Sequence, residues 1–298
     1  MKKISSLTAL GAMILTLWSG AAQAQTLLYQ WTFNNGNGTP DVTAGGGTLS
    51  INTLTGTGSN LGYNSTGGPG VYGANGALTV SGGGYNGGNT SVAIASDLTG
   101  LGTLSQVSVG FWFNIGASVI SGGLQFPRFV EFGASTTYDA GGKGSGNVNG
   151  IGTSINQENT SNFGLQNGVA GATGSDPTFG PNPGTLSPNT WYYELVTYDG
   201  TSLKTYIGLS PAALSQYGAT VAANFGSINF GTSATVLIGN DNAVAAPRAL
   251  SMGSIADVQI WSGIEPAPEP GTLTIAGLGL AGLWVMIRRR QVCNKKLS

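Results

Sequence analysis

The stretch WYYELVTYDGTSLKTYI, residues 191–207, decides the fold of this chain. Its two halves are rich in aromatic and β-branched residues, which favour strands. Asp199 and Gly200 stand between the halves, and Asp-Gly is a strong hairpin signal because both turn positions tolerate positive φ. The stretch therefore predicts two antiparallel strands joined by a tight turn.

Alternation along the first strand of this hairpin puts large side chains on both of its faces. Val196 and Tyr198 share one face, and Trp191, Tyr193 and Leu195 share the other. We expect the hairpin to be buried on one side and to be covered, or used for binding, on the other.

Similar runs recur on both sides of the hairpin, separated by Gly, Asn, Ser and Thr. Many short strands with turn signals between them are typical of a single two-layer antiparallel sandwich. Glycine-rich inserts at 39–74 and 134–157 interrupt the pattern, and the first of them is predicted to be an extra hairpin or a disordered loop. The predicted strands are 27–33, 77–80, 91–94, 106–114, 128–132, 162–166, 191–198, 203–207, 236–238 and 256–261.

The charged residues are unevenly distributed. Between residues 25 and 270 there are four Lys or Arg and all 12 Asp and Glu, a formal balance of −8. This argues against nucleic acid as a partner, because nucleic acids are held by clustered Lys and Arg. Histidine is absent and the single cysteine is Cys293, so the body holds no His or Cys zinc site, Ser-His-Asp triad or thiolate nucleophile.

The N-terminus reads as a secretory signal peptide, residues 1–24. Lys2 and Lys3 precede an apolar run, and the small residues Ala22 and Ala24 predict cleavage before Gln25. The alternative, an N-terminal membrane anchor, is disfavoured because the apolar run is short and a cleavage site follows it.

The C-terminus reads as a Pro-rich linker at 265–270, an uncharged apolar run at 271–287 and a basic tail at 288–298. Seventeen uncharged, mostly apolar residues are at the low end of what a transmembrane helix needs. Basic residues mark the cytoplasmic side of such a helix, and three stand together here: Arg288, Arg289 and Arg290.

The central hairpin and several other motifs resemble the laminin G-like, concanavalin A-like jelly-roll family. The resemblance rests on the order of the motifs and covers most of residues 27–263. It implies an all-β, two-sheet antiparallel jelly-roll sandwich over 25–264, of a kind that binds glycans or calcium. The motifs are LLYQWTFNNG (27–36), VSVGFWFNIG (107–116), RFVEFG (128–133), NFGLQNG (162–168), NTWYYELVTYDGTSLKTYIG (189–208), VLIGND (236–241) and GSIADVQIWSG (253–263).

Glycan binding needs aromatic faces for sugar C–H surfaces and neutral polar groups for hydroxyls. The aromatic candidates are Trp112, Trp191 and Tyr193, and the polar candidates are Asn240 and Asn242. The alternative for each aromatic is an ordinary place in the core.

Calcium is a candidate cofactor, with Asp241 and Asp257 as ligands. Asp241 lies in a run of oxygen-bearing side chains after a predicted strand, as in a calcium loop, and Asp257 matches a position that is acidic in the family. Asp41 and Asp199 are further acidic side chains that could approach in space. The alternative is that Asn and Asp serve here as ordinary turn formers.

The sequence predicts that the protein is not an enzyme. Jelly-roll glycosidases carry a Glu-x-Asp-x-x-Glu pattern, which supplies the paired carboxylates of retaining hydrolysis, and this pattern does not occur here. Glu131, Glu158 and Glu194 each stand alone in the sequence.

The C-terminal residues Pro268, Glu269 and Pro270, with the apolar run and the three arginines, resemble the PEP-CTERM sorting signal of Gram-negative bacteria. The resemblance implies an inner-membrane intermediate, cleavage by an exosortase, and delivery to the cell surface or to an exopolysaccharide or biofilm matrix. The alternative is a plain C-terminal anchor with a Pro-rich stalk.

Three functions follow from these patterns. The first is a secreted, lectin-like domain that binds exopolysaccharide or another glycan. The second is a structural biofilm-matrix protein without a specific ligand, and the third is a glycoside hydrolase or lyase.

Overall fold

The computed structural model describes residues 25–55, 59–81, 90–117, 127–134, 149–156, 163–171, 178–180, 186–240 and 252–264 of the 298 residues. The predicted signal peptide, 1–24, and the predicted linker, membrane helix and basic tail, 265–298, lie outside these ranges. Within the ranges, no helix combines the length and apolar character that crossing a membrane requires.

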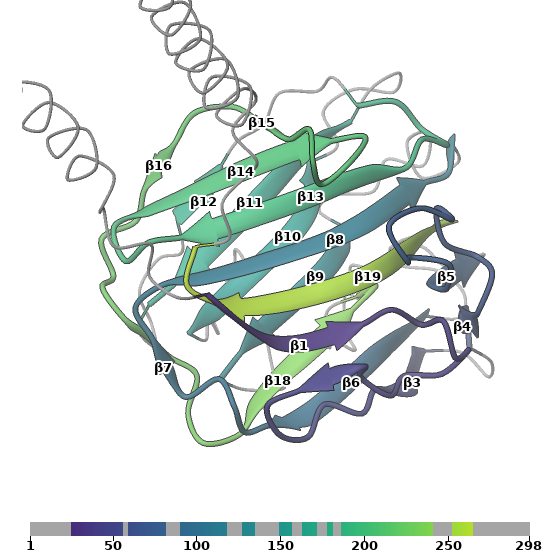
Figure 1. Ribbon diagram of the computed structural model, residues 1–298, viewed down its shortest axis with the longest axis horizontal. Helices are drawn as coiled ribbons and strands as arrows, with labels where there is room; N and C mark the ends of the chain where they lie inside the picture. The colour runs from purple at the N-terminus through teal and green to yellow at the C-terminus, as the bar shows by residue number, and fades with distance from the viewer. Residues whose placement is uncertain are drawn as a thin grey trace, which may run out of the picture.

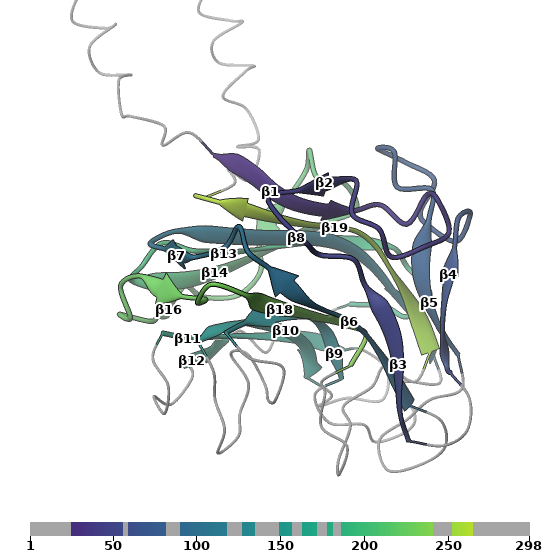
Figure 2. The same cartoon turned by 90° about the horizontal axis from the view of Figure 1, so that it is seen from below.

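The described strands form two antiparallel layers, seen from the front in Figure 1 and edge-on in Figure 2. The described part of the larger sheet has ten strands. They are β1 (Thr26–Trp31), β2 (Val42–Thr43), β4 (Leu61–Asn64), β5 (Ala77–Ser81), β8 (Val107–Ile115), β13 (Tyr192–Tyr198), β14 (Ser202–Gly208), β15 (Ser215–Gln216), β16 (Val221–Ala222) and β19 (Met252–Ser262). Their main order is β15-β14-β13-β8-β19-β1-β2, with β16 beside β14, β5 beside β19, and β4 beside β5.

The smaller sheet has seven described strands in the order β12-β11-β10-β9-β18-β6-β3. They are β3 (Ser50–Thr55), β6 (Thr90–Leu98), β9 (Arg128–Gly133), β10 (Gly150–Asn156), β11 (Gly164–Ala170), β12 (Thr178–Gly180) and β18 (Ala234–Ile238). A separate short ladder joins β7 (Thr103–Leu104) to β17 (Ile228–Asn229). The all-β, two-sheet antiparallel sandwich predicted from the sequence is confirmed.

The central hairpin is β13 and β14, and its two faces divide as alternation predicts. Val196 and Tyr198 lie in the core between the sheets, whereas Tyr193 and Leu195 belong to a second cluster. The predicted hairpin is present, but Asp199 and Gly200 are not its two central residues, because Tyr198 pairs with Leu203 and, within the loop between them, the Asp199 N–H donates to the Ser202 carbonyl at 3.2 Å.

Only Gly200 of this loop has a positive φ, 92°. The Asp199 carboxylate holds the loop instead, by accepting hydrogen bonds from the backbone N–H groups and hydroxyls of Thr201 and Ser202. A side chain that closes its own turn in this way replaces the second positive φ of a two-residue hairpin.

The core between the sheets is rich in aromatic side chains. Phe113 of the larger sheet meets Phe129 of the smaller sheet with ring centroids 4.6 Å apart, and both side chains are buried. Burying one phenylalanine stabilises a fold by about 1.5–3 kcal/mol. Residues 25–264 contain no cysteine and can form no disulfide, so apolar burial and sheet hydrogen bonds hold the sandwich together.

The two glycine-rich inserts contribute strands to both sheets. In the first insert, β3 pairs with β6 at the edge of the smaller sheet, and β4 pairs with β5 in the larger one. β4 and β5 are consecutive and antiparallel, so the second half of the insert forms a hairpin with the strand that follows it, whereas β3 pairs with β6 of the other sheet. In the second insert, β10 lies between β9 and β11.

The two ends of the described domain are neighbours. Thr26, at the start of β1, pairs with Ser262, at the end of β19. The side-chain amide of Gln25 also donates a hydrogen bond to the carbonyl of Ile264.

Candidate functional site

An outer aromatic cluster covers the face of the larger sheet that is turned away from the smaller sheet. Its buried members come from β5, β8, β13, β19 and the segments before β5 and β15, and three partly buried side chains pack against them. The buried members are Ala74, Ala77, Trp112, Tyr193, Leu195, Leu214, Ala256 and Trp261, and the partly buried ones are Leu27, Trp191 and Tyr206.

Sheet register brings two of the predicted aromatic residues together. Tyr193 of β13 pairs with Trp112 of β8, and their rings meet edge to face with centroids 5.5 Å apart. Gly110 makes room for this arrangement, because a Cβ at this position would lie 2.3 Å from the Tyr193 hydroxyl and 3.0 Å from Trp261. Tyr193 can therefore lie across the sheet towards Trp261.

A hydrogen-bond chain continues from Tyr193 along this face. Its hydroxyl lies 3.4 Å from the side-chain oxygen of Gln259, whose amide nitrogen donates to both carboxylate oxygens of Asp257 at 3.0 and 3.1 Å. Gln30 donates a further hydrogen bond of 2.7 Å to Asp257. The Asp257 carboxylate thus fixes the orientation of Gln259, which presents its oxygen to Tyr193.

Asp257 lies in an irregular part of β19, with a φ of 48°. Burial raises the pKa of its carboxyl, the hydrogen bonds from Gln30 and Gln259 oppose this, and the nearby charge of Asp41 adds to the rise. Asp199 is elsewhere, in the loop between β13 and β14. Among the described residues, no three Asp, Glu, His or Cys side chains gather in a way that could hold a metal ion.

Tyr72, which the sequence did not single out, extends the outer aromatic cluster to the surface. Its ring stacks on Trp112 at a centroid distance of 6.2 Å, and its side chain is 62% exposed. It is the second residue of a tight turn in which the Ala74 N–H donates to the Val71 carbonyl at 3.0 Å. Tyr72 and Gly73 have φ of 52° and 83°, as the two central residues of a type I′ turn do.

An exposed apolar patch is defined here by residues of the two segments that meet at the Tyr72 hydroxyl. It consists of Val71, Tyr72 and Leu209, which are 44%, 62% and 66% exposed and are the exposed large hydrophobic residues of the described chain. The Tyr72 hydroxyl donates a hydrogen bond of 3.0 Å to Ser210, which joins the two segments. Glycine next to tyrosine was the only local sequence signal for this turn.

The predicted polar glycan-binding residues do not join the aromatic ones. Asn240 is buried just beyond the end of β18, in the other sheet, and donates a hydrogen bond to the Ser91 carbonyl. Asp241 and Asn242 lie outside the described residues. Of the predicted aromatic residues, Trp112 and Tyr193 are buried and Trp191 is partly buried, all on the face described above.

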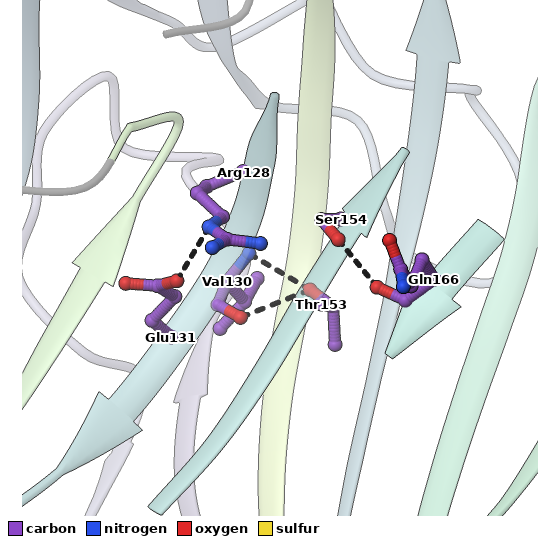
Figure 3. Close-up of polar contacts among 6 residues, drawn as sticks. All are labelled: Arg128, Val130, Glu131, Thr153, Ser154 and Gln166. Carbon is purple, nitrogen blue, oxygen red and sulfur yellow. Dashed lines mark hydrogen bonds and ion pairs between the residues drawn. The ribbon is translucent and has the colours of Figure 1, made fainter. Parts of the chain in front are cut away.

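The smaller sheet carries a buried ion pair on its own outer face (Figure 3). The Arg128 Nε lies 2.8 Å from a carboxylate oxygen of Glu131. A β-bulge makes this pairing possible, because Phe129 and Val130 together oppose Thr153 and both point into the core. Thr153 seals the bulge through hydrogen bonds of 2.9 Å with both backbone groups of Val130.

The outer face of the smaller sheet continues from β9 over β10 and β11. Ser154 donates a hydrogen bond to the carbonyl of Gln166, its partner on β11 (Figure 3). Glu194, by contrast, lies between the sheets, where Asn167 donates to it at 2.6 Å. Glu131 and Glu194, the two glutamates in the described chain, therefore sit on opposite sides of the smaller sheet and do not form a facing carboxylate pair.

Residues 266–290 match the PEP-CTERM protein-sorting motif. The motif indicates export and sorting to the cell surface or matrix, and it implies processing by an exosortase. The described body has the jelly-roll architecture expected from its resemblance to laminin G-like and concanavalin A-like domains. The chain is thus an exported β-sandwich protein with a C-terminal sorting signal. No curated protein matches it in sequence.

Solved structures with a similar fold include domain 4 of AbnA, a GH43 extracellular arabinanase from Geobacillus stearothermophilus, in complex with arabinotriose. The identity is 18% and the TM-score 0.52, over 82% of this chain and 96% of that domain. The botulinum neurotoxin serotype G binding domain gives 18% identity and a TM-score of 0.44, over 76% of this chain and 46% of that one. The enzymatically active domain of tailspike protein 2 of bacteriophage CBA120 gives 11% identity and a TM-score of 0.46, over 72% of this chain and 28% of that one.

Proposed function

We propose that the β-sandwich binds an extracellular polysaccharide and does so without catalysing a reaction. The observation that carries this proposal is the outer aromatic cluster, which reaches the surface at Tyr72 and is linked through Tyr193 and Gln259 to a hydrogen-bond chain. Aromatic faces beside neutral hydrogen-bonding groups suit the mixed C–H and hydroxyl surface of a sugar.

The similarity to domain 4 of AbnA supports the proposal, because that domain has this fold and was crystallised with an oligosaccharide. Glu131 and Glu194 lie on opposite sides of the smaller sheet, so they cannot serve together as the two carboxyl groups, about 5 Å apart, that a retaining glycosidase needs.

The sorting motif supports the place of action. We propose that the chain passes through an inner-membrane intermediate in a Gram-negative bacterium, is cut near Pro268, Glu269 and Pro270, and ends in an exopolysaccharide or biofilm matrix. Mass spectrometry of the surface fraction should then find a C-terminus near these residues. Recovery of peptides through Ser298 from that fraction would contradict processing and would favour a plain membrane anchor.

The binding proposal is tested by affinity electrophoresis of the purified protein through gels that contain soluble polysaccharides. Retardation by at least one polysaccharide is expected. The same gels with calcium or with a chelator test calcium as a cofactor at Asp257. Because Gln30 and Gln259 already occupy the Asp257 carboxylate, we expect equal retardation in both.

A second candidate is a structural matrix protein without a specific ligand. The burial of Trp112 and Tyr193 favours it, because buried rings serve packing first. Under this alternative, deleting the gene weakens the cohesion of the matrix, while the purified protein migrates unchanged through every polysaccharide gel.

A further inference from the structure

We propose that the exposed apolar patch of Val71, Tyr72 and Leu209 is a subsite that stacks on one pyranose ring of an uncharged polysaccharide. This inference rests on the proposed function and assigns it to a definite surface. The Tyr72 ring is the platform, and the exposed residues Val71 and Leu209 directly precede Tyr72 and its hydrogen-bond partner Ser210 in the chain.

The Tyr72 ring has one face available for a ligand. Its other face rests on the Trp112 indole, with an angle of 25° between the two planes. A side chain that is 62% exposed while one of its faces is covered must present the opposite face to solvent. Exposed aromatic faces suit the apolar C–H side of a sugar ring.

The backbone holds this ring in place before any ligand arrives. Tyrosine at a positive φ is uncommon, since such positions in type I′ turns favour Asn, Asp and Gly. Asn34 clamps the turn by donating to the Gly73 carbonyl at 2.8 Å and accepting from the N–H groups of Asn75 and Gly76 at 3.0 and 2.7 Å. A ring fixed in this way loses little conformational freedom on binding.

The surroundings of the patch determine the charge of the ligand. Residues 70–76 and 208–214 contain no Lys, Arg, Asp or Glu, so the two segments that form the patch offer no ion-pair partner. They do offer neutral groups for sugar hydroxyls, such as Ser210, which already joins Tyr72. A neutral polysaccharide fits these groups better than an acidic one.

The size of the patch argues against a protein partner. A stable protein interface covers about 800 Å² on each partner, which takes about 20–30 residues. Three exposed hydrophobic side chains on two short loops form a contact of the size of one sugar ring. An extended polysaccharide can still bind well through such a contact, because its neighbouring units offer repeated attachment.

The experiment compares Tyr72→Asn with Tyr72→Phe in the full chain, held in lipid nanodiscs. Asn suits the I′ turn and removes the ring, whereas Phe keeps the ring and removes only the bond to Ser210. Affinity is measured by calorimetry for dextran, a soluble β-glucan and arabinan as neutral probes, and for alginate as an acidic probe.

We expect at least one neutral probe to bind the wild-type protein and Tyr72→Asn to weaken that binding about tenfold, a change of about 1.4 kcal/mol. Tyr72→Phe should stay within about twofold, because the stacked face is unchanged. Leu209→Asn, at a side chain that is 66% exposed and outside the core, should weaken binding while the melting temperature stays unchanged.

The outcomes separate this inference from the proposed function. If the wild-type protein binds none of the probes, both fail. If it binds a neutral probe and neither Tyr72→Asn nor Leu209→Asn weakens the binding, the polysaccharide function stands and the patch is not its site. Tighter binding of alginate than of every neutral probe overturns the assignment to an uncharged ligand.

Discussion

The side-chain amide of Asn167 on β11 donates a hydrogen bond of 2.6 Å to the carboxyl group of Glu194 on β13, across the core between the two sheets. The same amide donates to Thr205 on β14 at 2.8 Å. This polar contact ties the two layers together at one register in a region that is otherwise apolar.

Glu194 should make stability depend on pH. Burial raises the pKa of its carboxyl from 4.5 to about 8, against the opposing effect of the bond from Asn167. The folded protein therefore keeps a proton that the unfolded chain releases. Its contribution is complete below pH 4.5 and is lost as pH rises to about 8, by about 1.4 kcal/mol per pH unit at most.

Urea unfolding of the wild-type protein and Glu194→Gln between pH 4.5 and 8.5 checks this prediction. The variant carries no titrating group at this position, so the difference in free energy of unfolding between the two proteins should change steadily across the range. A difference that stays constant with pH would show that Glu194 is ionised in the folded state.

Removing one partner of the Arg128–Glu131 ion pair should lower the free energy of unfolding more than removing both partners together. Replacing Arg128 with Met leaves a buried carboxylate, and replacing Glu131 with Leu leaves a buried guanidinium, so each should lower the free energy of unfolding by about 3–5 kcal/mol. The double variant should lose much less than the sum. A double-mutant cycle from denaturant unfolding measures the difference, and additive losses would mean that the two groups do not interact.

Gly110 should be intolerant of a side chain. In Gly110→Ala the new methyl group must displace the Tyr193 ring, at a cost of about 1–3 kcal/mol in stability, and tryptophan fluorescence should change as Trp112 and Trp261 repack. Gly62→Ala is the matched control, because a Cβ there meets only Thr79 at an ordinary 3.8 Å. Equal melting temperatures for both variants would rule out the tight packing over Gly110.

Asp199 should contribute stability with the opposite pH dependence. Partial burial raises the pKa of its carboxyl, but hydrogen bonds from Ser202 and Thr201 outweigh this and lower it from 3.8 to about 2. Its contribution is present above pH 3.8 and is lost as pH falls through about 2.

Asp199→Ala should therefore cost about 1 kcal/mol at pH 7, after allowance for solvent screening of a partly exposed group. Asp199→Asn, which keeps one acceptor oxygen, should cost less. Thermal melts at pH 7 and pH 2 measure both effects. A loss in Asp199→Ala of the same size at the two pH values would show that the carboxylate charge plays no part.

The division of β13 into two faces could be predicted from the sequence, because alternation separates Val196 and Tyr198 from Tyr193 and Leu195. The face that lies between the sheets could not be chosen from the sequence, because both faces carry large side chains.

The strand β10 could not be predicted from the sequence. Its sequence GIGTSIN alternates Ile151, Thr153 and Ile155 with Gly and Ser at the end of a glycine-rich run, and the pairing with β9 and β11 on both sides makes it a central strand.

The buried ion pair and the exposed Tyr72 ring depend on contacts that local sequence patterns do not encode. Alternation places Arg128 and Glu131 on opposite faces of β9, and only the bulge at Phe129 and Val130 brings them together. Tyr72 lies in a run of glycines and gains its role from Trp112, forty residues later in the chain. Trp112 and Tyr193 were predicted as candidates, but only the register of β8 and β13 shows that they touch.

The pairing of Thr26 with Ser262 determines how the domain responds to mechanical load. A force that separates residues 25 and 264 pulls β1 and β19 apart in the unzipping geometry, so the hydrogen bonds between them break one after another. A force between residue 264 and a polymer held at Tyr72 acts instead along β19, which is bonded to β1 and β5 on one side and to β8 on the other, and loads many bonds in shear. The domain should therefore be easy to draw out by both ends and hard to tear from a matrix by its C-terminal end alone.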